Sequence, residues 1–336
     1  MIFPTEIWYC AARAVELSTK PISRIICNEP IVLFRTLESG QYVALEDRCP
    51  HRQAPLSMGR VVGEEIMCQY HGWMMNADGR CTHVPHQDSV SPHAVVKSYP
   101  IVEKWGLMWL WIGEADRADK RSIPDMPWLV SDDHSTILSR FYSEANYQLM
   151  ADNLLDVSHA DFLHANSFGS QAGRKGKTDN VKQEMEVTTD NTCVTSVRIL
   201  HDVALGPMAA AWGGFTKNIT RTTRQRWEPP NTVMIELTMA NEENRITFNH
   251  DHMMTPETET TSHYFLGFTR DFNLESGYPT DEDMRREQES VVRTEDIPMV
   301  EAQQLNRNRF GTPQNIPGQA DKFLIAVHKR IAEHNG

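Results

Sequence analysis

The chain of 336 residues has no run of about 18 uninterrupted apolar residues, the length that a membrane-spanning helix needs. Its most apolar segment, residues 101–113, is interrupted by Glu103 and Lys104. Residues 1–17 carry Glu6, Arg13 and Glu16 within an apolar stretch, so they lack the pattern of a secretory signal. We therefore expect a soluble, cytoplasmic protein.

Positive charge is also scarce, because the sequence has 33 basic and 45 acidic residues, which gives a formal net charge of -12. An acidic excess of this size argues against nucleic acid or an anionic membrane surface as a partner. The sequence has no internal repeat and no low-complexity segment. Its length is enough for two ordinary domains, each with its own core.

A disulfide framework is not expected either, although the number of cysteines is even. Disulfides are rare in large chains without an export signal. Cys49, Cys68 and Cys81 stand near a histidine. Of these, Cys49 and Cys68 are taken as metal ligands, and the other four cysteines are expected to be reduced and structural. The six are Cys10, Cys27, Cys49, Cys68, Cys81 and Cys193.

The first third of the chain reads as short strands separated by turns, because apolar and β-branched runs alternate with Gly, Pro and Asn. Turns are expected at residues 28–30 and 39–40. This pattern predicts a small antiparallel β domain over residues 1–115. The expected strands are 24–27, 31–36, 42–46, 65–68, 95–98 and 107–111.

The charge-dense segment 114–122 marks the expected boundary, and a second domain is predicted over residues 116–336. Helices are expected at 147–163, 281–304 and 319–333, and Asp190-Asn191 supplies a hairpin turn. Antiparallel strands with helices on one side make the predicted fold class α+β. The expected strands are 181–187, 193–200, 218–227, 232–239, 245–254 and 262–269.

The first chemical constellation is a pair of short loops, Cys49-Pro50-His51 and Cys68-Gln69-Tyr70-His71. Each loop offers one thiolate and one imidazole. In a Rieske [2Fe–2S] centre two cysteines hold one iron and two histidines hold the other. The alternative is a structural Cys2His2 zinc site, but zinc sites usually pair like ligands within a loop. The ligand pattern favours the cluster.

The second constellation is His159 and His164, which diverge by about 140° on a straight helix. They can bind one metal only if the helix distorts or ends between them. Two histidines and one carboxylate on one face of an iron leave positions open for O2 and substrate. The alternative is a polar helix end with solvated histidines. The carboxylate candidates on the late helix are Glu287, Glu289, Glu295 and Asp296.

Two further residues bear on this second site. Asp156 lies three residues before His159, where its carboxylate is expected to accept the hydrogen bond of a metal-bound imidazole. Pro298 should disturb the late helix and leave a carbonyl near Thr294 without its usual donor. A locally bent helix is one way to aim a ligand inward.

The stretches CPHRQAPLSMG (49–59) and CQYHGW (68–73) resemble the cluster loops of Rieske oxygenases. WYCAA from Trp8, VEKWGLMWLWIGE from Val102 and PETETTSHYFLGFTRDF (256–272) are most similar to the vanillate and dicamba O-demethylase branch. The resemblance covers most of the chain. It implies an N-terminal all-β Rieske [2Fe–2S] domain followed by a helix-grip catalytic domain, and it places Cys81 and His83 outside the cluster.

The resemblance also implies the ligands of a mononuclear Fe(II), because TEDIPMVEAQQ (294–304) is similar to the family stretch whose aspartate binds the metal. That assigns Asp296 to the iron beside His159 and His164. Asn153 matches a motif position near the iron, where it lies beside the metal ligands rather than being one of them. In the family the aspartate matching Asp156 meets a cluster histidine of a neighbouring subunit, here His71, which implies a homotrimer.

The family further implies the partners and the reaction. A reductase with a flavin and a ferredoxin-type cluster delivers NAD(P)H electrons, and O2 is used to oxidise a small aromatic acid. The leading interpretation is O-demethylation of a methoxybenzoate with release of formaldehyde. Alternatives are hydroxylation of another methyl or ring carbon, a Rieske electron carrier without oxygenase activity, and a zinc-stabilised ligand-binding protein.

Three residues are expected in the substrate pocket from the same resemblance. His252 matches a substrate-contacting histidine of the dicamba enzymes, where an imidazole could hold a carboxylate or phenol oxygen. Glu287 replaces a pocket tryptophan and Ile235 replaces a pocket asparagine, so dicamba itself is not the expected substrate. The alternative for His252 is an exposed histidine on a strand.

Overall fold

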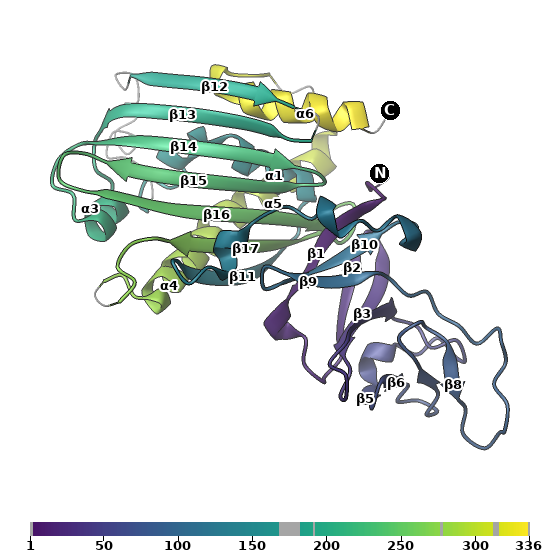
Figure 1. Ribbon diagram of the computed structural model, residues 1–336. Coiled ribbons are helices and arrows are strands. Elements are labelled where there is room, and N and C mark those ends of the chain that lie inside the picture. Colours follow the sequence, from purple (N-terminus) through teal and green to yellow (C-terminus); the bar gives the residue numbers. More distant parts are fainter. Residues whose placement is uncertain (1–2, 168–181, 191, 276–277, 312–315, 335–336) are drawn as a thin grey trace. The chain divides into compact units, whose positions relative to one another are not determined.

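The computed structural model describes residues 3–167, 182–190, 192–275, 278–311 and 316–334 (Figure 1). It divides into two compact units, Met1–Asp125 with Thr255–Glu259, and Met126–Met254 with Thr260–Gly336. The domain boundary expected at residues 115 and 116 stays a prediction. Among the described residues, no helix is long and apolar enough to cross a membrane.

The first unit is built from strands in three small antiparallel sheets, with the orders β1-β10-β9, β2-β3-β4 and β5-β6-β7-β8. The strands are β1 Ile7–Arg13, β2 Ile22–Ile26, β3 Glu29–Arg35, β4 Tyr42–Glu46, β5 Arg60–Val62, β6 Glu65–Met67, β7 Met74–Met75, β8 Cys81–His83, β9 Ile101–Lys104 and β10 Leu107–Ile112. The short 3-10 helices are η1 Ala14–Glu16, η2 Leu56–Met58, η3 Ala115–Arg117 and η4 Lys120–Ser122.

The β nature of this unit confirms the predicted class of the N-terminal domain, with shifts at individual strands. The predicted turn at residues 28–30 lies one residue earlier, because Cys27 and Asn28 take the positive φ angles of 54° and 66° while Pro30 already belongs to β3. The predicted strand at residues 95–98 is wrong. That segment makes only isolated bridges, Arg80 to Val95 and Leu45 to Ser98.

The second unit contains a seven-stranded antiparallel sheet with the order β11-β17-β16-β15-β14-β13-β12 (Figure 1). Strands β12 to β17 pair with their neighbours in chain order. β11, the first of the seven in the sequence, pairs with β17 at the sheet edge. The strands are β11 Ser135–Ser143, β12 Gln183–Thr189, β13 Val194–Val203, β14 Ile219–Glu228, β15 Thr232–Ala240, β16 Arg245–Pro256 and β17 Ser262–Arg270. Each strand predicted from 181 onward is present within a few residues. β11 was not predicted.

Of the predicted hairpin turn Asp190-Asn191, Asn191 lies outside the described residues. The Oδ1 atom of Asp190 accepts hydrogen bonds from the backbone N–H groups of Thr192 and Cys193, at 2.6 and 2.8 Å. These bonds hold the chain at the start of β13, as an aspartate in a turn commonly does.

Helices pack on one face of this sheet, since α1 contacts β15 and β17 and lies behind the strands together with α5 in Figure 1. An antiparallel sheet with helices on one side confirms the α+β class. The helices are α1 Tyr147–Leu155, α3 Pro207–Gly213, α4 Asp281–Val291, α5 Ile297–Phe310 and α6 Lys322–His334. The 3-10 helices are η5 Pro127–Val130, η6 Val157–Asp161 and η8 Gln319–Asp321, and η7 Val292–Asp296 is a π turn.

Two predicted helices are interrupted in the structure. The helix predicted over residues 147–163 was too long, because α1 ends at Leu155 and Asp156 leaves the helical region with φ -107° and ψ 88°. The helix predicted over residues 281–304 continues to Phe310 but contains the π turn at Val292–Asp296. Both interruptions fall at the predicted metal ligands.

Candidate metal centres and substrate pocket

The two cysteine loops of the first unit have the same backbone hydrogen bonds. The N–H of Cys49 donates to the carbonyl of Ala54 and the N–H of Gln53 donates to Cys49, at 2.8 and 3.0 Å. In the second loop the N–H of Cys68 donates to Trp73 and the N–H of Gly72 donates to Cys68, also at 2.8 and 3.0 Å. Each loop closes through a residue with positive φ, Gln53 at 62° and Gly72 at 71°.

The loops present two sulfurs and two imidazoles to each other. The thiols of Cys49 and Cys68 are buried and interact, and burial raises the pKa of Cys49 to about 11. The rings of His51 and His71 lie with centroids 4.6 Å apart, and His51 stacks on Trp73. A buried thiol with a raised pKa becomes a thiolate only beside positive charge, which iron supplies.

A single zinc ion does not fit this group. Zinc bonds of about 2.0–2.3 Å would bring four ligand atoms close together. Among the described residues, one group of three or more such atoms lies within 4.8 Å of one another, and it is His159, His164 and Asp296. The cysteine loops are not in it, and a sulfur pair beside a separate nitrogen pair suits two irons.

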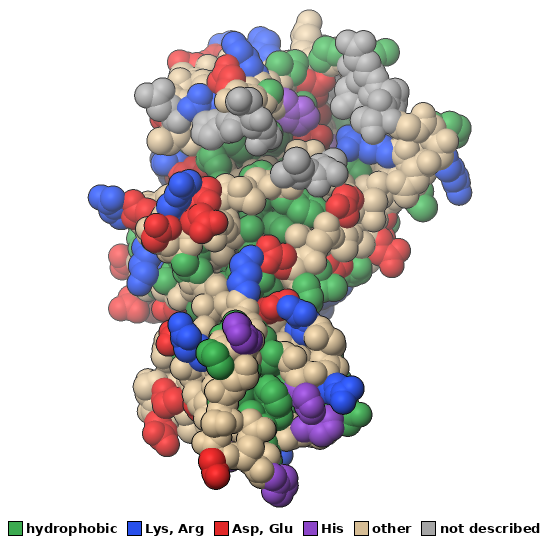
Figure 2. Space-filling model, turned by 90° about the vertical axis from the view of Figure 1, so that its right-hand side faces the viewer, with side chains coloured by type: hydrophobic (Ala, Val, Ile, Leu, Met, Phe, Trp, Pro, Cys, Tyr) green, Lys and Arg blue, Asp and Glu red, His purple; other side chains and the backbone are tan. Residues whose placement is uncertain are grey.

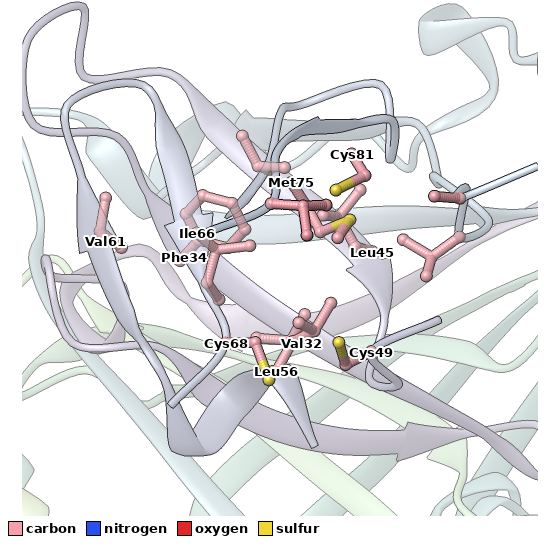
Figure 3. Close-up of a cluster of buried hydrophobic side chains, with 14 residues drawn as sticks. Val32, Phe34, Leu45, Cys49, Leu56, Val61, Ile66, Cys68, Met75 and Cys81 are labelled. Carbon is pink, nitrogen blue, oxygen red and sulfur yellow. The ribbon is translucent and has the colours of Figure 1, made fainter. Parts of the chain in front are cut away.

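Cys81 stands apart from the two loop cysteines, as the resemblance implied. Figure 3 shows its side chain beside Met75, at the opposite end of the buried cluster from Cys49 and Cys68. Its neighbour His83 is exposed on β8. His71 is exposed as well, and Figure 2 shows histidine side chains at the surface of this unit, in the lower part of the view.

In the second unit His159 and His164 are brought together because the chain changes conformation between them. His159 lies on η6, which ends at Asp161, and His164 follows in the turns beyond. The two Nε2 atoms lie 3.2 Å apart. Asp296 Oδ1 lies 3.2 Å from Nε2 of His164 and 3.7 Å from Nε2 of His159.

These three atoms point their lone pairs at one place. Nδ1 of His159 lies 2.6 Å from the carbonyl oxygen of Asp156, and Nδ1 of His164 lies 2.6 Å from Oε2 of Glu295. Each Nδ1 thus donates its hydrogen, which leaves Nε2 of a neutral ring as an acceptor. Asp296 Oδ1 is buried and has no hydrogen-bond partner within the described chain. The group needs a cation at its centre, and a divalent iron fits it.

The pKa shifts of the two histidines agree with a metal ion at this site. Burial lowers the pKa of His159, which favours the neutral ring that a metal requires. Burial also acts to lower the pKa of His164, but the carboxylates of Asp296 and Glu295 outweigh it and raise that pKa. The site therefore attracts positive charge, a proton in the absence of metal or the metal itself.

The π turn explains how two consecutive acids reach the same histidine. In this turn the N–H of Ile297 donates to the carbonyl of Val292, five residues earlier instead of four. Glu295 meets Nδ1 of His164 while Asp296 meets its Nε2. Pro298 follows at the start of α5, so the predicted local distortion of the helix is confirmed.

Asp156 is the hydrogen-bond partner of His159, as predicted, but through a different atom. The backbone carbonyl of Asp156, and not its carboxylate, accepts the hydrogen bond of His159. The carboxylate instead accepts from the N–H of Ser158 at 2.9 Å and caps η6. Sequence reasoning considered Glu295 only as a candidate metal ligand and missed its role of orienting His164. Its position beside the aspartate of TEDIPMVEAQQ was the available signal.

Asn153 and Asp156 line an open groove of about 1120 Å³ in the second unit. His159 lies in the same groove wall, so the metal group has a side that faces it. Oδ1 of Asn153 is buried without a hydrogen-bond partner in the part of the chain described. Its predicted role near the iron stays a prediction.

A separate cavity of about 110 Å³ is walled by His159, His164 and Asp296 on one side and by the sheet on the other. His252 and Ile235 lie in this wall, and their contact with a substrate stays a prediction. Nδ1 of His252 lies 2.6 Å from the hydroxyl of Tyr264, and its Nε2 is buried with no partner among the described residues. Burial lowers the pKa of His252 well below its usual range.

Glu287 was placed in this cavity wrongly. Its Oε2 accepts from the indole Nε1 of Trp212 at 3.1 Å, and it lines a different cavity beside Tyr278. The next residue on α4, Gln288, is buried and lines the predicted pocket instead. Adjacent residues of a helix point about 100° apart, so Glu287 and Gln288 lie on different faces of α4.

Comparisons with known proteins agree with both sites. The model described as the vanillate O-demethylase oxygenase C-terminal domain matches residues 143–334, and that of the Rieske [2Fe-2S] domain matches residues 7–100. The chain belongs to the Rieske non-haem iron oxygenases. This membership excludes the zinc-stabilised binding protein.

Several relatives of this Rieske oxygenase are similar over nearly their whole length. A putative toluene-4-sulfonate monooxygenase iron-sulfur subunit of Comamonas testosteroni is 35% identical over 94% of this chain and 92% of the relative. The dicamba O-demethylase oxygenase component of Stenotrophomonas maltophilia is 32% identical over 91% and 90%. A vanillate O-demethylase oxygenase subunit of a Pseudomonas species is 33% identical over 91% and 87%.

A crystal structure of dicamba monooxygenase bound to 3,6-dichlorosalicylic acid superposes with a TM-score of 0.87 at 29% identity, over 99% of this chain and 98% of the other. The Rieske oxygenase described here is therefore the oxygenase component of a monooxygenase system. It contains a [2Fe–2S] domain and a His–His–Asp group that can hold a mononuclear iron. Such components act with a redox partner on an aromatic substrate.

Replacing His164 with Ala removes one of the three donors to the second site. We expect the mononuclear iron to be lost, while the two irons of the cluster and its visible absorption remain. O2-dependent product formation should fall to background. Metal analysis and the absorption spectrum check this, with His201→Ala, on β13, as the control. Unchanged product formation would exclude the mononuclear site.

Replacing Glu295 with Gln keeps the shape of the side chain but removes the charge that orients His164. We expect the affinity for Fe(II) at this site to fall about 10- to 100-fold. Titration of iron-depleted protein with Fe(II) measures this. Glu289→Gln is the matched control, because Glu289 lies on α4 and accepts from Ser139. Equal affinities in the two variants would show that Glu295 does not support the metal.

Proposed function

We propose that this Rieske oxygenase O-demethylates a small, single-ring methoxybenzoate and releases formaldehyde. The observation that carries the proposal is that the His–His–Asp group forms part of the wall of the 110 Å³ cavity. An engineered apolar cavity of about 150 Å³ takes one benzene ring, so this cavity suits one ring and not several. Two relatives are oxygenase components of a dicamba and a vanillate O-demethylase.

The ligand assignment follows the geometry. Cys49 and Cys68 would hold one iron of the cluster and His51 and His71 the other. His159, His164 and Asp296 would hold the mononuclear Fe(II). Once bound, these groups supply single electrons and O2 activation, respectively.

The reaction consumes O2, two electrons and two protons, and it returns one water. One oxygen atom enters a C–H bond of the methoxy carbon, and the hemiacetal formed collapses to a phenol and formaldehyde. We propose a reductase with a flavin and a ferredoxin-type cluster as the source of the NAD(P)H electrons. A cytoplasmic location, expected from the sequence, belongs to the same proposal.

The chain's own residues position the substrate. His252 is neutral, so its Nε2 can hold an oxygen substituent of the ring without a counter-charge. Ile235 and the other apolar residues of the wall exclude water around the ring. Tyr264 fixes the ring of His252 through Nδ1. His159 and His164 would then face the side of the ring opposite the substituent that His252 holds.

We further propose a homotrimer in which Asp156 of one subunit meets His71 of the next. Asp156 lies in the wall of the open groove, and His71 is exposed. The groove also carries apolar side chains that are unusually exposed, which is typical of a protein interface. They are Phe162 at 59%, Met299 at 45%, Phe310 at 79%, Ile316 at 95% and Ile325 at 47%.

A second candidate is hydroxylation of a ring methyl group without demethylation. It is favoured by the toluene-4-sulfonate relative, which is 35% identical to this chain. The same cavity and the same metal group would serve it. The two reactions differ in the fate of the oxidised carbon, which is lost in the first and retained in the second.

Turnover of methoxybenzoates should release formaldehyde in proportion to the NADH consumed, because each demethylated ring yields one formaldehyde. The holoenzyme with a compatible reductase is assayed against 2-, 3- and 4-methoxybenzoate, with the corresponding toluic acids as controls. Toluic acids should give hydroxymethyl products and no formaldehyde. Absence of formaldehyde with all three methoxybenzoates would sink the demethylase proposal.

Asp156→Asn should stop coupled turnover while both metal sites stay loaded, since the amide Oδ1 can still cap η6. Cys68→Ser should also be inactive, because it loses the cluster. If electrons pass between subunits, co-expression of the two inactive chains restores part of the activity. The cluster of the Asp156→Asn chain then serves the intact iron site of its neighbour.

The oligomers are separated by two affinity tags and sized against the chain mass of 38.4 kDa. The control is a mixture of the two separately assembled oligomers, which should stay inactive. Activity absent from verified mixed oligomers would place electron transfer within one chain and contradict the proposed bridge.

A further inference from the structure

Arg221 is a buried cation in the wall of the substrate cavity. It lies on β14 and is 7% exposed, and its guanidinium nitrogen Nε is buried with no hydrogen-bond partner in the described chain. Its nearest acid is Asp161 on η6, at 3.8 Å from Nη1 to Oδ1. No other Lys or Arg among the described residues lines this cavity.

A guanidinium in this setting is incompletely paired. It carries five N–H donors, and an N–H···O hydrogen bond needs a heavy-atom distance of about 2.7–3.2 Å. The contact with Asp161 is longer than that. A buried charge without full pairing is costly to the fold, so such a residue is typically completed by a ligand or serves a specific purpose.

The register of the sheet places Arg221 at one end of the cavity. Successive rows across β14, β15 and β16 are Arg221–Met239–Ile246, Thr223–Leu237–Phe248, Gln225–Ile235–His250 and Trp227–Val233–His252. Each row is two residues along the strand, about 6.6 Å, so the backbone of Arg221 lies about 20 Å along the strands from that of His252, and both side chains reach into the cavity between. Leu237 and Phe248 line the cavity between these two residues, together with the polar side chains of Thr223 and His250.

The two ends differ in charge. His252 is held neutral by burial, so it offers a hydrogen bond without a charge. Arg221 is positively charged at every physiological pH and presents a planar fork of donors that matches a carboxylate or sulfonate. An aromatic acid that enters this cavity therefore gains most if its anionic group meets Arg221.

We propose that Arg221 binds the anionic group of the aromatic substrate, a carboxylate or a sulfonate, and thereby selects acids over neutral rings and fixes which ring position faces the metal group. The inference rests on the proposed function, because it assumes that an aromatic compound enters this cavity. It adds a specificity-determining residue at the end of the cavity opposite His252.

The rival explanation is that Arg221 serves only as a buried counter-charge for Asp161. Both explanations predict some loss of stability when Arg221 is replaced. They differ in the ratio between the affinity for an acid and the affinity for its neutral amide. A loosened fold lowers both affinities, whereas loss of an anion contact lowers only the affinity for the acid.

The test measures that ratio by calorimetry on the anaerobic holoenzyme, so that no turnover is needed. The ligand pairs are 4-methoxybenzoate with 4-methoxybenzamide and toluene-4-sulfonate with toluene-4-sulfonamide, which also separates the two kinds of anion. The variants are Arg221→Gln and Arg221→Lys. Arg198→Gln is the matched control, since Arg198 lies on the neighbouring strand β13, donates to Gln183 and does not line the cavity.

We expect Arg221→Gln to weaken binding of at least one acid about 10- to 100-fold, the size of a lost charged hydrogen bond. Binding of its amide should change less than about threefold, and Arg221→Lys should restore part of the acid affinity. Arg198→Gln should leave both ligands unchanged. Iron content should match the wild type throughout.

Equal losses for acid and amide, or no loss for either acid, would overturn the proposal, as would a wild-type protein that binds neither acid. The outcome is distinguishable from that of the formaldehyde assay. If acids bind through Arg221 and no formaldehyde forms, the demethylase proposal fails and the role of Arg221 stands. If formaldehyde forms and the ratio of acid to amide affinity is unchanged in Arg221→Gln, the demethylase proposal stands and the role of Arg221 fails.

Discussion

The convergence of three lone pairs, from His159, His164 and Asp296, is the constraint on which the second unit depends. The lone pairs of ligand atoms that face one another across 3.2–3.7 Å repel unless a cation stands between them. The chain holds them there by giving up regular helix twice, at the end of α1 and at the π turn before α5. Each interruption leaves backbone groups that would be costly if they did not serve the site.

The orienting hydrogen bonds make this arrangement rigid. His159 is fixed by a backbone carbonyl, and His164 is fixed by the carboxylate of Glu295. The difference matters electrostatically, since the carboxylate adds negative charge beside one ligand only. Both Nδ1 atoms are thereby committed, which leaves the two Nε2 atoms for the metal.

The sheet supplies one wall of the cavity. Its strands place Arg221 in one row and His252 three rows away, with Leu237, Phe248 and Ile235 in the rows between. A low local dielectric keeps His252 neutral and strengthens every polar contact with a ligand. The groove on the other side of the metal group is open and contains Asp156. Under the proposed function, electrons would reach the metal group from the groove and substrate from the cavity.

The fold class, the two cysteine–histidine loops and the histidine pair were predicted from short-range patterns, whereas Asp296 was assigned to the iron only by the resemblance to the family. Strand alternation revealed β12 to β17, and the close spacing of Cys49 with His51 and of Cys68 with His71 marked the loops. β11 went unpredicted because STILSRFYS (135–143) mixes small polar residues into its alternation. The full length of α1 was overestimated because apolar spacing continues past Asp156, where the backbone turns.

The amino-acid sequence by itself determined the candidate thiolate, imidazole and carboxylate ligands through residue type and local spacing, and only the resemblance to the family singled out Asp296 among the late acids. Tertiary structure decided which atoms face one another. The roles of Glu295, Gln288 and Arg221 arise only when a π turn, a helix face and the register of three strands are fixed. These depend on contacts between residues far apart in the chain, which no local pattern encodes.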